Sequence, residues 1–235
     1  MLKISRQPDG RPEVFHSIQG EGLHAGRPAV FLRLALCNLA CVWCDTRYTW
    51  DWEHFDQGRE VTTVSVDEAE REIRRYHCHS LVVTGGEPLV QQKPLTPLLE
   101  CLKGRGFWIE IETNGTIVPG RRLLDIVDHW SVSPKLENSG NPRPSRENPD
   151  AYRLFRDLTS AHFKYVLEKA DDLSELRALM HRYEIPSGRI ILMPQAQDRD
   201  TLLDRSRWLV DLCKSEGYLF STRLQILLWG NRRGV

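Results

Sequence analysis

Apolar runs of strand length alternate with amphipathic segments along this chain, and that alternation limits the possible folds more than any other feature. Strands that alternate with helices are typical of parallel βαβ units. We therefore expect an α/β fold: a partial, TIM-like barrel of mostly parallel strands with helices outside it. The predicted strands are 29–36, 80–84, 107–113, 130–133, 162–167, 189–193 and 224–228, and the predicted helices are 65–76, 95–103, 172–183 and 201–217.

The length of 235 residues suits one domain over 1–235. The helix predicted at 65–76 begins with Ser65 and has Glu68 three residues later, which is a capping-box pattern. We expect an aromatic and acidic insertion at 47–64, which is a lid, a docking site for an electron donor or a packed insertion. The Pro- and Asn-rich segment 138–149 is predicted to be a surface loop.

The charges balance, with 32 Lys plus Arg and 32 Asp plus Glu, so no net charge favours nucleic acid or a membrane surface. No run reaches the ~18 apolar residues of a membrane span, and the N-terminal residues lack the apolar core of a signal peptide. We expect a cytoplasmic protein that binds neither nucleic acid nor a membrane. Clustered cysteines in that compartment favour a metal or catalysis over disulfides.

Three of the six cysteines, Cys37, Cys41 and Cys44, have the spacing C-x3-C-x2-C. A cubane iron–sulfur cluster is usually held by four thiolates, so three would leave one iron open to a small molecule. The alternative is a Cys3His zinc site with one histidine from elsewhere. The candidates for that ligand are His24, His77 and His79. Among the other cysteines, we expect Cys101 and Cys213 to be buried in helices and Cys78 to lie in a solvated turn.

Further motifs accompany the cysteines, namely TGGEP at 84–88 and S-x-Q-G-E-G at 17–22. The cysteine spacing together with GGEP resembles the signature of radical S-adenosylmethionine (SAM) enzymes. S-x-Q-G-E-G, and C-D-T at the third cysteine, resemble one branch of that superfamily, 7-carboxy-7-deazaguanine synthase. The segments that carry the resemblance are EVFHSIQGEG (13–22), FLRLALCNLACVWCDT (31–46), TGGEP (84–88), ETNG (112–115), SPK (133–135) and LMPQ (192–195).

The resemblance implies that Cys37, Cys41 and Cys44 hold a 4Fe–4S cluster whose open iron binds SAM. Two glycines after a buried strand let a backbone approach a ligand closely, and Glu87 is expected to orient the ammonium group of SAM. Trp43 either shields the cluster sulfurs or is an ordinary core aromatic. The residues expected at SAM are Trp43, Cys44, Asp45, Gly85, Gly86, Glu87, Ser133, Pro134, Lys135 and Gln195.

The resemblance implies 6-carboxy-5,6,7,8-tetrahydropterin as the substrate. Arg33 lies on an apolar strand, where an unpaired charge is costly, so it is paired or directed into a site. The resemblance also implies that Thr46 and the substrate carboxylate hold Mg²⁺. A neutral hydroxyl is a poor sole ligand for Mg²⁺, so we expect this site to form fully only with substrate. The expected substrate-binding residues are Ile18, Gln19, Gly20, Glu21, Arg33, Thr84, Glu112 and Gln225.

The implied reaction is a radical ring contraction with loss of ammonia that gives 7-carboxy-7-deazaguanine, a queuosine precursor. An electron donor such as flavodoxin or ferredoxin, and a homodimer, are implied in the same way. Many relatives carry Q-x-H near the C-terminus, whereas Leu227 here follows Gln225 in place of the histidine. The tail 229–235 either folds over the pocket or frays. Activation of a glycyl-radical partner, another radical modification and a non-catalytic zinc module remain alternatives.

Overall fold

A ten-stranded sheet is the frame of the computed structural model, which describes residues 1–235. The strand order is β10-β9-β8-β7-β6-β5-β3-β1-β4, and β2 pairs with β3. Strands β3 and β5 to β10 run parallel, whereas β1, β2 and β4 are antiparallel to their neighbours. The strands are β1 (Leu2–Ser5), β2 (Val14–Ile18), β3 (Pro28–Leu34), β4 (Val61–Val64), β5 (Ser80–Gly85), β6 (Trp108–Thr113), β7 (His129–Val132), β8 (Ala161–Leu167), β9 (Ile190–Pro194) and β10 (Leu219–Phe220).

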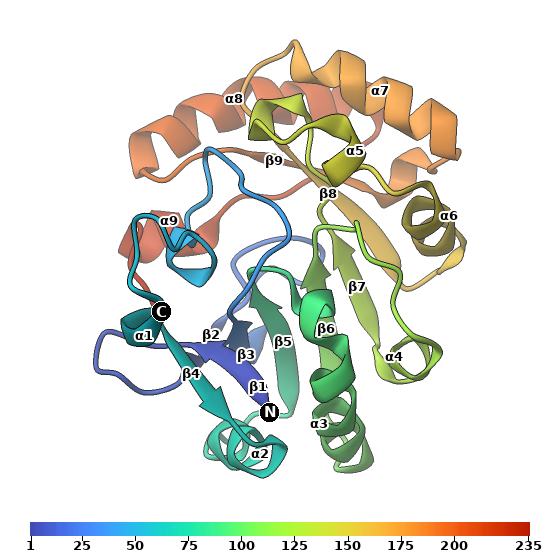
Figure 1. Ribbon diagram of the computed structural model, residues 1–235. Coiled ribbons are helices and arrows are strands. Elements are labelled where there is room, and N and C mark those ends of the chain that lie inside the picture. The colour runs from blue at the N-terminus through green and yellow to red at the C-terminus, as the bar shows by residue number, and fades with distance from the viewer.

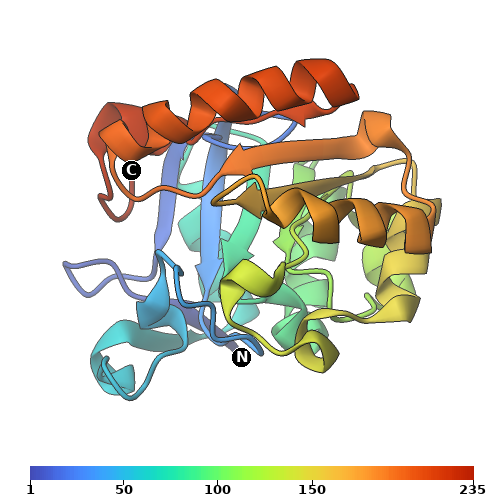
Figure 2. The ribbon, with the colours of Figure 1, turned by 90° about the horizontal axis from the view of Figure 1, so that it is seen from above.

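The sheet curves but does not close, because β10 and β4 stand at opposite ends of the strand order without pairing. The predicted partial barrel is therefore confirmed. Most helices lie around the outside of the curve (Figure 1), and α8 runs along the outer side of β9 (Figure 2). The helices are α1 (Gln57–Glu60), α2 (Val66–Arg74), α3 (Gln92–Gly104), α4 (Arg121–Ile126), α5 (Arg143–Arg146), α6 (Pro149–Asp157), α7 (Asp172–Tyr183), α8 (Arg199–Glu216) and α9 (Leu224–Trp229).

Side-chain alternation on β6 separates the apolar core from a polar barrel interior. Ile109 and Ile111 have no exposed surface and belong to a core of 40 buried residues between the sheet and the outer helices. Glu110 and Glu112 alternate with them and face the inside of the barrel, because successive side chains on a strand point to opposite faces. Polar groups on the inner face of parallel strands are thus available to a site.

Local sequence signals predict several elements well. The capping box is present: Ser65 Oγ accepts from the Glu68 backbone N–H, and a Glu68 oxygen accepts from the Ser65 N–H at 2.7 Å.

Among the isolated cysteines, Cys213 is buried as expected, whereas Cys101 is only partly buried. Cys78 is also partly buried, with its sulfur 3.6 Å from the Pro28 carbonyl oxygen, so its turn is less solvated than predicted.

The strand predicted at 224–228 is wrong, because this segment forms the short helix α9. Its apolar residues are consecutive, a pattern that does not distinguish a strand from a helix. Only Ile226 is fully buried, against Ala196 and Leu202, while Leu228 is 57% exposed. The last strand of the sheet is instead the two-residue β10, beside β9.

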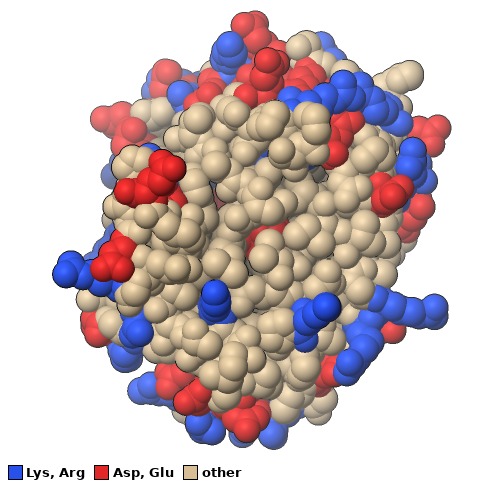
Figure 3. All heavy atoms as spheres, in the orientation of Figure 1, with Lys and Arg blue, Asp and Glu red and all other residues tan.

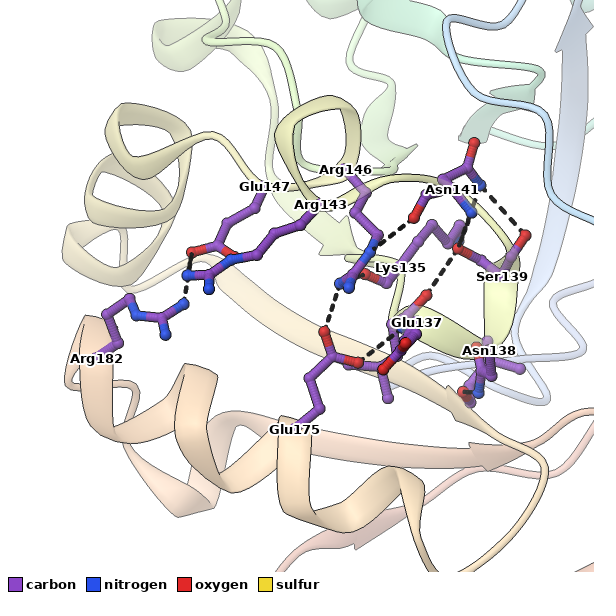
Figure 4. Close-up of polar contacts among 12 residues, drawn as sticks. Lys135, Glu137, Asn138, Ser139, Asn141, Arg143, Arg146, Glu147, Glu175 and Arg182 are labelled. Atoms are coloured by element: carbon purple, nitrogen blue, oxygen red, sulfur yellow. Dashed lines mark hydrogen bonds and ion pairs between the residues drawn. The ribbon is translucent and has the colours of Figure 1, made fainter.

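The segment 138–149 lies at the surface as predicted, but it is not simply a loop. This segment holds the end of a 3₁₀ turn and α5, and α6 begins at its last residue. Arg146 explains the order, because its buried guanidinium binds the Asn141 and Lys135 carbonyls and the Glu175 carboxylate at 2.5–3.1 Å (Figure 4). Pro and Asn residues here therefore mark a segment ordered by side-chain hydrogen bonds.

The segment 47–64 packs onto the frame. Its end forms β4, which pairs with β1, and the indole N–H of Trp50 donates to the sulfur of Cys44 at 3.3 Å. Of the three interpretations of this segment, the packed one fits these contacts.

Charged side chains ring the face seen in Figure 3, whose centre is mostly uncharged. No helix is long and apolar enough to cross a bilayer.

Candidate active site

One cavity opens at the carboxyl ends of the parallel strands, where α/β barrels place their sites. Most of the residues singled out in the sequence line it, although they come from segments far apart in the chain. Those residues are Ile18, Gln19, Gly20, Glu21, Arg33, Cys37, Cys41, Trp43, Cys44, Asp45, Thr46, Thr84, Gly85, Gly86, Glu112, Ser133, Lys135, Gln195 and Gln225.

The three clustered cysteines lie on the loop after β3, and each sulfur has its own hydrogen-bond donor. The Leu39 backbone N–H lies 3.5 Å from the Cys37 sulfur, and the Asn141 amide lies 3.3 Å from that of Cys41. The third donor is the indole N–H of Trp50, which lies 3.3 Å from the Cys44 sulfur. Hydrogen bonds to sulfur ligands stabilise thiolate charge and tune a metal site. Asn141 comes from the segment predicted to be a surface loop.

These thiols suit a metal better than a disulfide. All three are free in the structure. Burial raises the pKa of Cys37 to about 12 and also raises the pKa of Cys41. A thiol in that environment becomes a thiolate when a metal ion stabilises the negative charge. The donor set therefore fits a cluster with three protein ligands.

Gly85 and Gly86 line the cavity, and they also let two backbone segments approach each other closely. A Cβ on Gly85 would lie 2.0 Å from the Leu34 carbonyl oxygen, and one on Gly86 would lie 2.0 Å from that of Leu36. Gly85 also has a φ of +133°, which disfavours any residue with a side chain. The glycines thus let the end of β5 pack directly onto the start of the cysteine loop.

Glu87 and Pro134 are the two predicted site residues that do not line the cavity. Glu87 has no exposed surface, and its carboxylate accepts from the Leu89 and Asn114 backbone N–H groups at 3.0 and 2.6 Å. Thr113 Oγ1 donates to it at 2.8 Å. Burial raises the pKa of this carboxyl group. Glu87 therefore joins the ends of β5 and β6, and its carboxylate is buried away from the cavity in which the ammonium group was expected.

Trp43 and Lys135 lie together on the wall of the cavity. Trp43 is half-buried and lines the cavity, so it is not an ordinary core aromatic. The Lys135 ammonium group lies 5.6 Å from the centre of the Trp43 ring and donates to Ser133 Oγ at 2.9 Å. An amphipathic wall of this kind can hold a ligand that has both charged and aromatic parts.

The other end of the cavity is organised around the Glu21 carboxylate. Lys164 donates to it at 2.6 Å, Arg223 at 2.9 Å and Gln225 at 2.7 Å. Burial alone would raise the pKa of Glu21, but Lys164 and Arg223 hold it well below its usual range. Arg223 also pairs with Asp45, next to the third cysteine. One guanidinium group therefore connects the two ends of the cavity.

Sequence reasoning missed Lys164 and Arg223, both of which line the cavity. Lys164 had a usable signal: like Arg33, it is a cation on a mostly apolar strand, β8. Arg223 has no such signal, because it precedes the apolar run 224–228, which predicts a strand rather than a site. Of the two interpretations of the tail 229–235, folding over the pocket fits the structure. Val235 lines the cavity, and the Arg233 guanidinium lies 3.5 Å from the centre of the Tyr48 ring.

Comparisons with known proteins agree with this geometry. The model of the radical SAM superfamily matches residues 34–200. A 7-carboxy-7-deazaguanine synthase from Pyrobaculum aerophilum is 38% identical over 94% of this chain and 95% of its own length. One from Rhodopirellula baltica is 33% identical over 95% of this chain and 87% of its own length. The chain belongs to the 7-carboxy-7-deazaguanine synthase family of radical SAM enzymes.

Solved structures support the family at the level of the fold. The crystal structure of QueE from Escherichia coli is 26% identical, covers 95% of this chain and 94% of its own, and superposes with a TM-score of 0.71. Streptococcus suis SuiB bound to S-adenosylmethionine, at 16% identity, a TM-score of 0.53 and coverage of 82% and 48%, shows the common fold alone. As a radical SAM enzyme, this chain uses a 4Fe–4S cluster and SAM.

The zinc alternative is not favoured. No histidine lines the cavity, so none of His24, His77 and His79 completes a Cys3His set there. His77 and His79 lie just before β5, at the amino ends of the parallel strands. His24 pairs with Glu110 at 2.9 Å inside the barrel. The three thiols therefore have no histidine beside them that would complete a zinc site.

Proposed function

We propose that this chain converts 6-carboxy-5,6,7,8-tetrahydropterin to 7-carboxy-7-deazaguanine with loss of ammonia, in the cytoplasmic biosynthesis of 7-deazapurines. One observation carries the proposal: a single cavity holds three free thiols at one end and the ionised Glu21 carboxylate at the other. The relatives named 7-carboxy-7-deazaguanine synthase align over almost the whole chain, so both ends of the cavity fall within the matched region. The glycyl-radical, zinc-module and other radical alternatives gain no comparable support.

Arg33 is the residue proposed to bind the substrate carboxylate. Its Nε donates to Glu13 at 2.9 Å, which fixes the plane of the guanidinium group and leaves its terminal nitrogens for a ligand. Tyr48 donates to the same carboxylate at 3.1 Å, and Arg233 also pairs with it. A planar guanidinium held in this way suits bidentate binding of a carboxylate.

Acceptor groups at the opposite end suit the N–H-rich edge of a pterin. Thr84 Oγ1 donates to Glu112 at 2.8 Å and the Gln19 amide donates to it at 3.1 Å, so this carboxylate is held in place. Gln225 lines the cavity beside Glu21, and its amide donates to the Glu21 carboxylate at 2.7 Å. Carboxylate oxygens at this end can accept hydrogen bonds from the ring N–H groups of a ligand. We therefore place the pterin edge at Glu21, Glu112 and Gln225.

Cys37, Cys41 and Cys44 are proposed to hold the cluster, with SAM between the cysteine loop and the glycine turn. When bound, the cluster and SAM supply a radical able to remove a hydrogen atom from the substrate. The protein itself positions the substrate and SAM and shields the reaction from water. Trp43 and Lys135 form the wall beside this end of the cavity, and the residues proposed to contact SAM are Trp43, Asp45, Gly85, Gly86, Ser133, Lys135 and Gln195.

Thr46 is proposed to bind Mg²⁺ together with the substrate carboxylate. Thr46 lines the cavity, with its hydroxyl 3.6 Å from the Cys44 sulfur. The adjacent Asp45 carboxylate is paired with Arg223, so its charge is already balanced. Mg²⁺ prefers negative oxygen ligands, and the substrate is the remaining source of one. The proposed site therefore forms only when the substrate is bound.

A reductant of the flavodoxin or ferredoxin type and a second copy of the chain are the proposed partners. Exposed apolar side chains on β10 and α9 support a contact between copies. These side chains are Leu219, Phe220, Leu228 and Trp229.

The test is turnover of the reconstituted enzyme. Anaerobic protein reconstituted with iron and sulfide is given SAM, a reductant, Mg²⁺ and 6-carboxy-5,6,7,8-tetrahydropterin. We expect 7-carboxy-7-deazaguanine and ammonia in equal amounts, with Mg²⁺ increasing the rate. Cys101→Ser is the control for a cysteine outside the proposed cluster. It should turn over as the parent does, since Cys101 lies in α3 away from the cavity. Cleavage of SAM without this product, in an enzyme with a complete cluster, would point to another substrate.

A further inference from the structure

A second group of potential metal ligands lies inside the barrel, apart from the active-site cavity. His24, Glu110 and His129 each offer one donor atom, and these atoms all lie within 4.8 Å of one another. His129 is the first residue of β7 and Glu110 lies near the start of β6, so the group is at the amino ends of the parallel strands. None of the three residues lines the cavity.

Side-chain hydrogen bonds satisfy only part of this group. His24 Nδ1 and a Glu110 oxygen are 2.9 Å apart, which accounts for a histidine–carboxylate pair. His129 is only 4% exposed, and its Nε2 has no hydrogen-bond partner in the protein. The neighbouring His162, whose ring centre is 5.2 Å from that of His129, also has an unpartnered buried nitrogen, Nδ1.

Burying a ring nitrogen without a partner is costly, so a fold retains such a group for a reason. The contact between His24 and Glu110 does not provide that reason, because it leaves His129 Nε2 without a partner. A water molecule would satisfy one nitrogen, but it would not account for a second imidazole and a carboxylate around the same point. A divalent metal ion would satisfy all three groups together.

We propose that His24, Glu110 and His129 bind one divalent transition-metal ion, for which Zn²⁺ is the fitting probe. Two imidazole nitrogens and one carboxylate oxygen are a ligand set that zinc and related metals accept, with further positions open to water. Ligand atoms around tetrahedral zinc are separated by about 3.3 Å. The His24–Glu110 pair is already that close, so binding requires chiefly a small movement of His129.

Metal binding would hold the segment between β2 and β3 in place against β6 and β7. This segment carries His24 towards its end and, at its start, Gln19 and Glu21, which line the active-site cavity. The Gln19 amide lies 3.4 Å from a Glu110 oxygen and 3.1 Å from a Glu112 oxygen. Glu110 is therefore shared between the proposed metal ion and the base of the cavity. The ion acts as a structural fastening rather than as a participant in the reaction.

The experiment measures zinc in the reconstituted holoenzyme, so that the cysteines are already occupied. Protein is equilibrated with Zn²⁺ in a chelator buffer and desalted, and zinc and iron are counted. X-ray absorption at the zinc edge then reports the ligands. We expect about one zinc per chain in addition to the iron, with nitrogen and oxygen neighbours at about 2.0–2.1 Å and no sulfur.

His24→Asn is the informative variant, because His24 is 25% exposed in its side chain and the change leaves the core intact. We expect it to weaken zinc binding at least tenfold while the iron content stays unchanged. Glu110→Gln is expected to do the same. His77→Asn, a histidine outside the group, is the matched control and is expected to bind zinc as the parent does.

Thermal unfolding provides a second readout that does not depend on turnover. Zinc is expected to raise the Tm of the parent and of His77→Asn, but not that of His24→Asn. The proposal is overturned if the holoenzyme retains no zinc, if the bound zinc has sulfur neighbours, or if His24→Asn binds zinc with the affinity of the parent.

Discussion

The side-chain amide of Asn141 donates a hydrogen bond to the sulfur of Cys41 across 3.3 Å. This contact joins a segment 100 residues further along the chain to the proposed cluster. Asn141 also accepts from the Ala40 N–H at 2.9 Å, so it holds the cysteine loop as well as the sulfur. Such a residue is expected to affect both the shape of the loop and the electronic properties of the cluster.

Replacing Asn141 with Ala is expected to lower the reduction potential of the cluster by tens of millivolts, because a hydrogen bond to a ligand sulfur stabilises the reduced form. A redox titration followed by EPR measures the change. Asn138→Ala is the control, since the Asn138 amide binds the Val166 carbonyl and Asp172 instead of a sulfur. An unchanged potential in Asn141→Ala with full iron content would contradict the role given to this contact.

Replacing Gly86 with Ala is expected to disrupt the junction between β5 and the cysteine loop. The new Cβ would lie 2.0 Å from the Leu36 carbonyl oxygen, and a backbone group cannot move aside as a flexible side chain can. We expect a loss of about 2 kcal/mol in the free energy of unfolding and a marked fall in iron bound after reconstitution. Gly104→Ala, with nothing within 4 Å of the added Cβ, should match or exceed the parent in stability.

Lys164→Met tests a residue that sequence reasoning missed. It removes one of the two cations that hold Glu21 ionised, at the end of the cavity assigned to the pterin. We expect kcat/KM for the pterin to fall about 10- to 100-fold, mainly through KM. Iron content should be unaffected. Lys103→Met, which removes a pair with Asp128 outside the cavity, should leave kcat/KM unchanged. Equal losses in the two variants would indicate that Lys164 is only structural.

The stability of the protein is expected to depend on Glu147 at acid pH. Burial would raise its pKa, but Arg143, Tyr183 and Arg182 lower the pKa to about 2. Because the folded pKa lies below the ordinary value of 4.5, the carboxylate stabilises the fold above pH 4.5, and this stabilisation is lost as the pH falls towards 2.

Urea unfolding of the parent and of Glu147→Gln at pH 6 and pH 3 measures this contribution. The parent should be the more stable at pH 6, and the difference between the two should shrink by about half at pH 3. Asp150→Asn serves as the control, because Asp150 is exposed and pairs with an exposed arginine, Arg153, so it should show little difference at either pH. A stability difference between the parent and Glu147→Gln that is larger at pH 3 than at pH 6 would contradict the predicted pH dependence.

The parallel strands β3 and β5 to β9, and the helices α2, α3, α7 and α8, were predictable because their signals are local. The Ser65–Glu68 capping box marks the start of α2, and α7 spans the residues that its periodicity predicts. The residues proposed for the cluster and the substrate were found through motifs, in which several residue types recur together at fixed spacing. These features do not depend on what lies elsewhere in the chain.

The features that sequence reasoning missed depend on distant contacts. The segment around Arg146 is ordered because its guanidinium meets Glu175 on α7, and no nearby residue indicates that partner. Arg223 reaches both Glu21 and Asp45, which lie at the other end of the chain. The helix at 224–229 forms where Ile226 packs against Ala196 and Leu202, a contact that its consecutive apolar residues do not specify.

The most direct test of the central claim is a Mössbauer spectrum of anaerobically reconstituted ⁵⁷Fe enzyme, recorded with and without SAM. Three protein thiolates on a cubane leave one iron chemically distinct, and SAM should change the signal of that iron alone. We predict one altered iron in four with SAM present. Four irons that do not respond to SAM, or protein that assembles no cubane while its three cysteines are intact, would contradict the account.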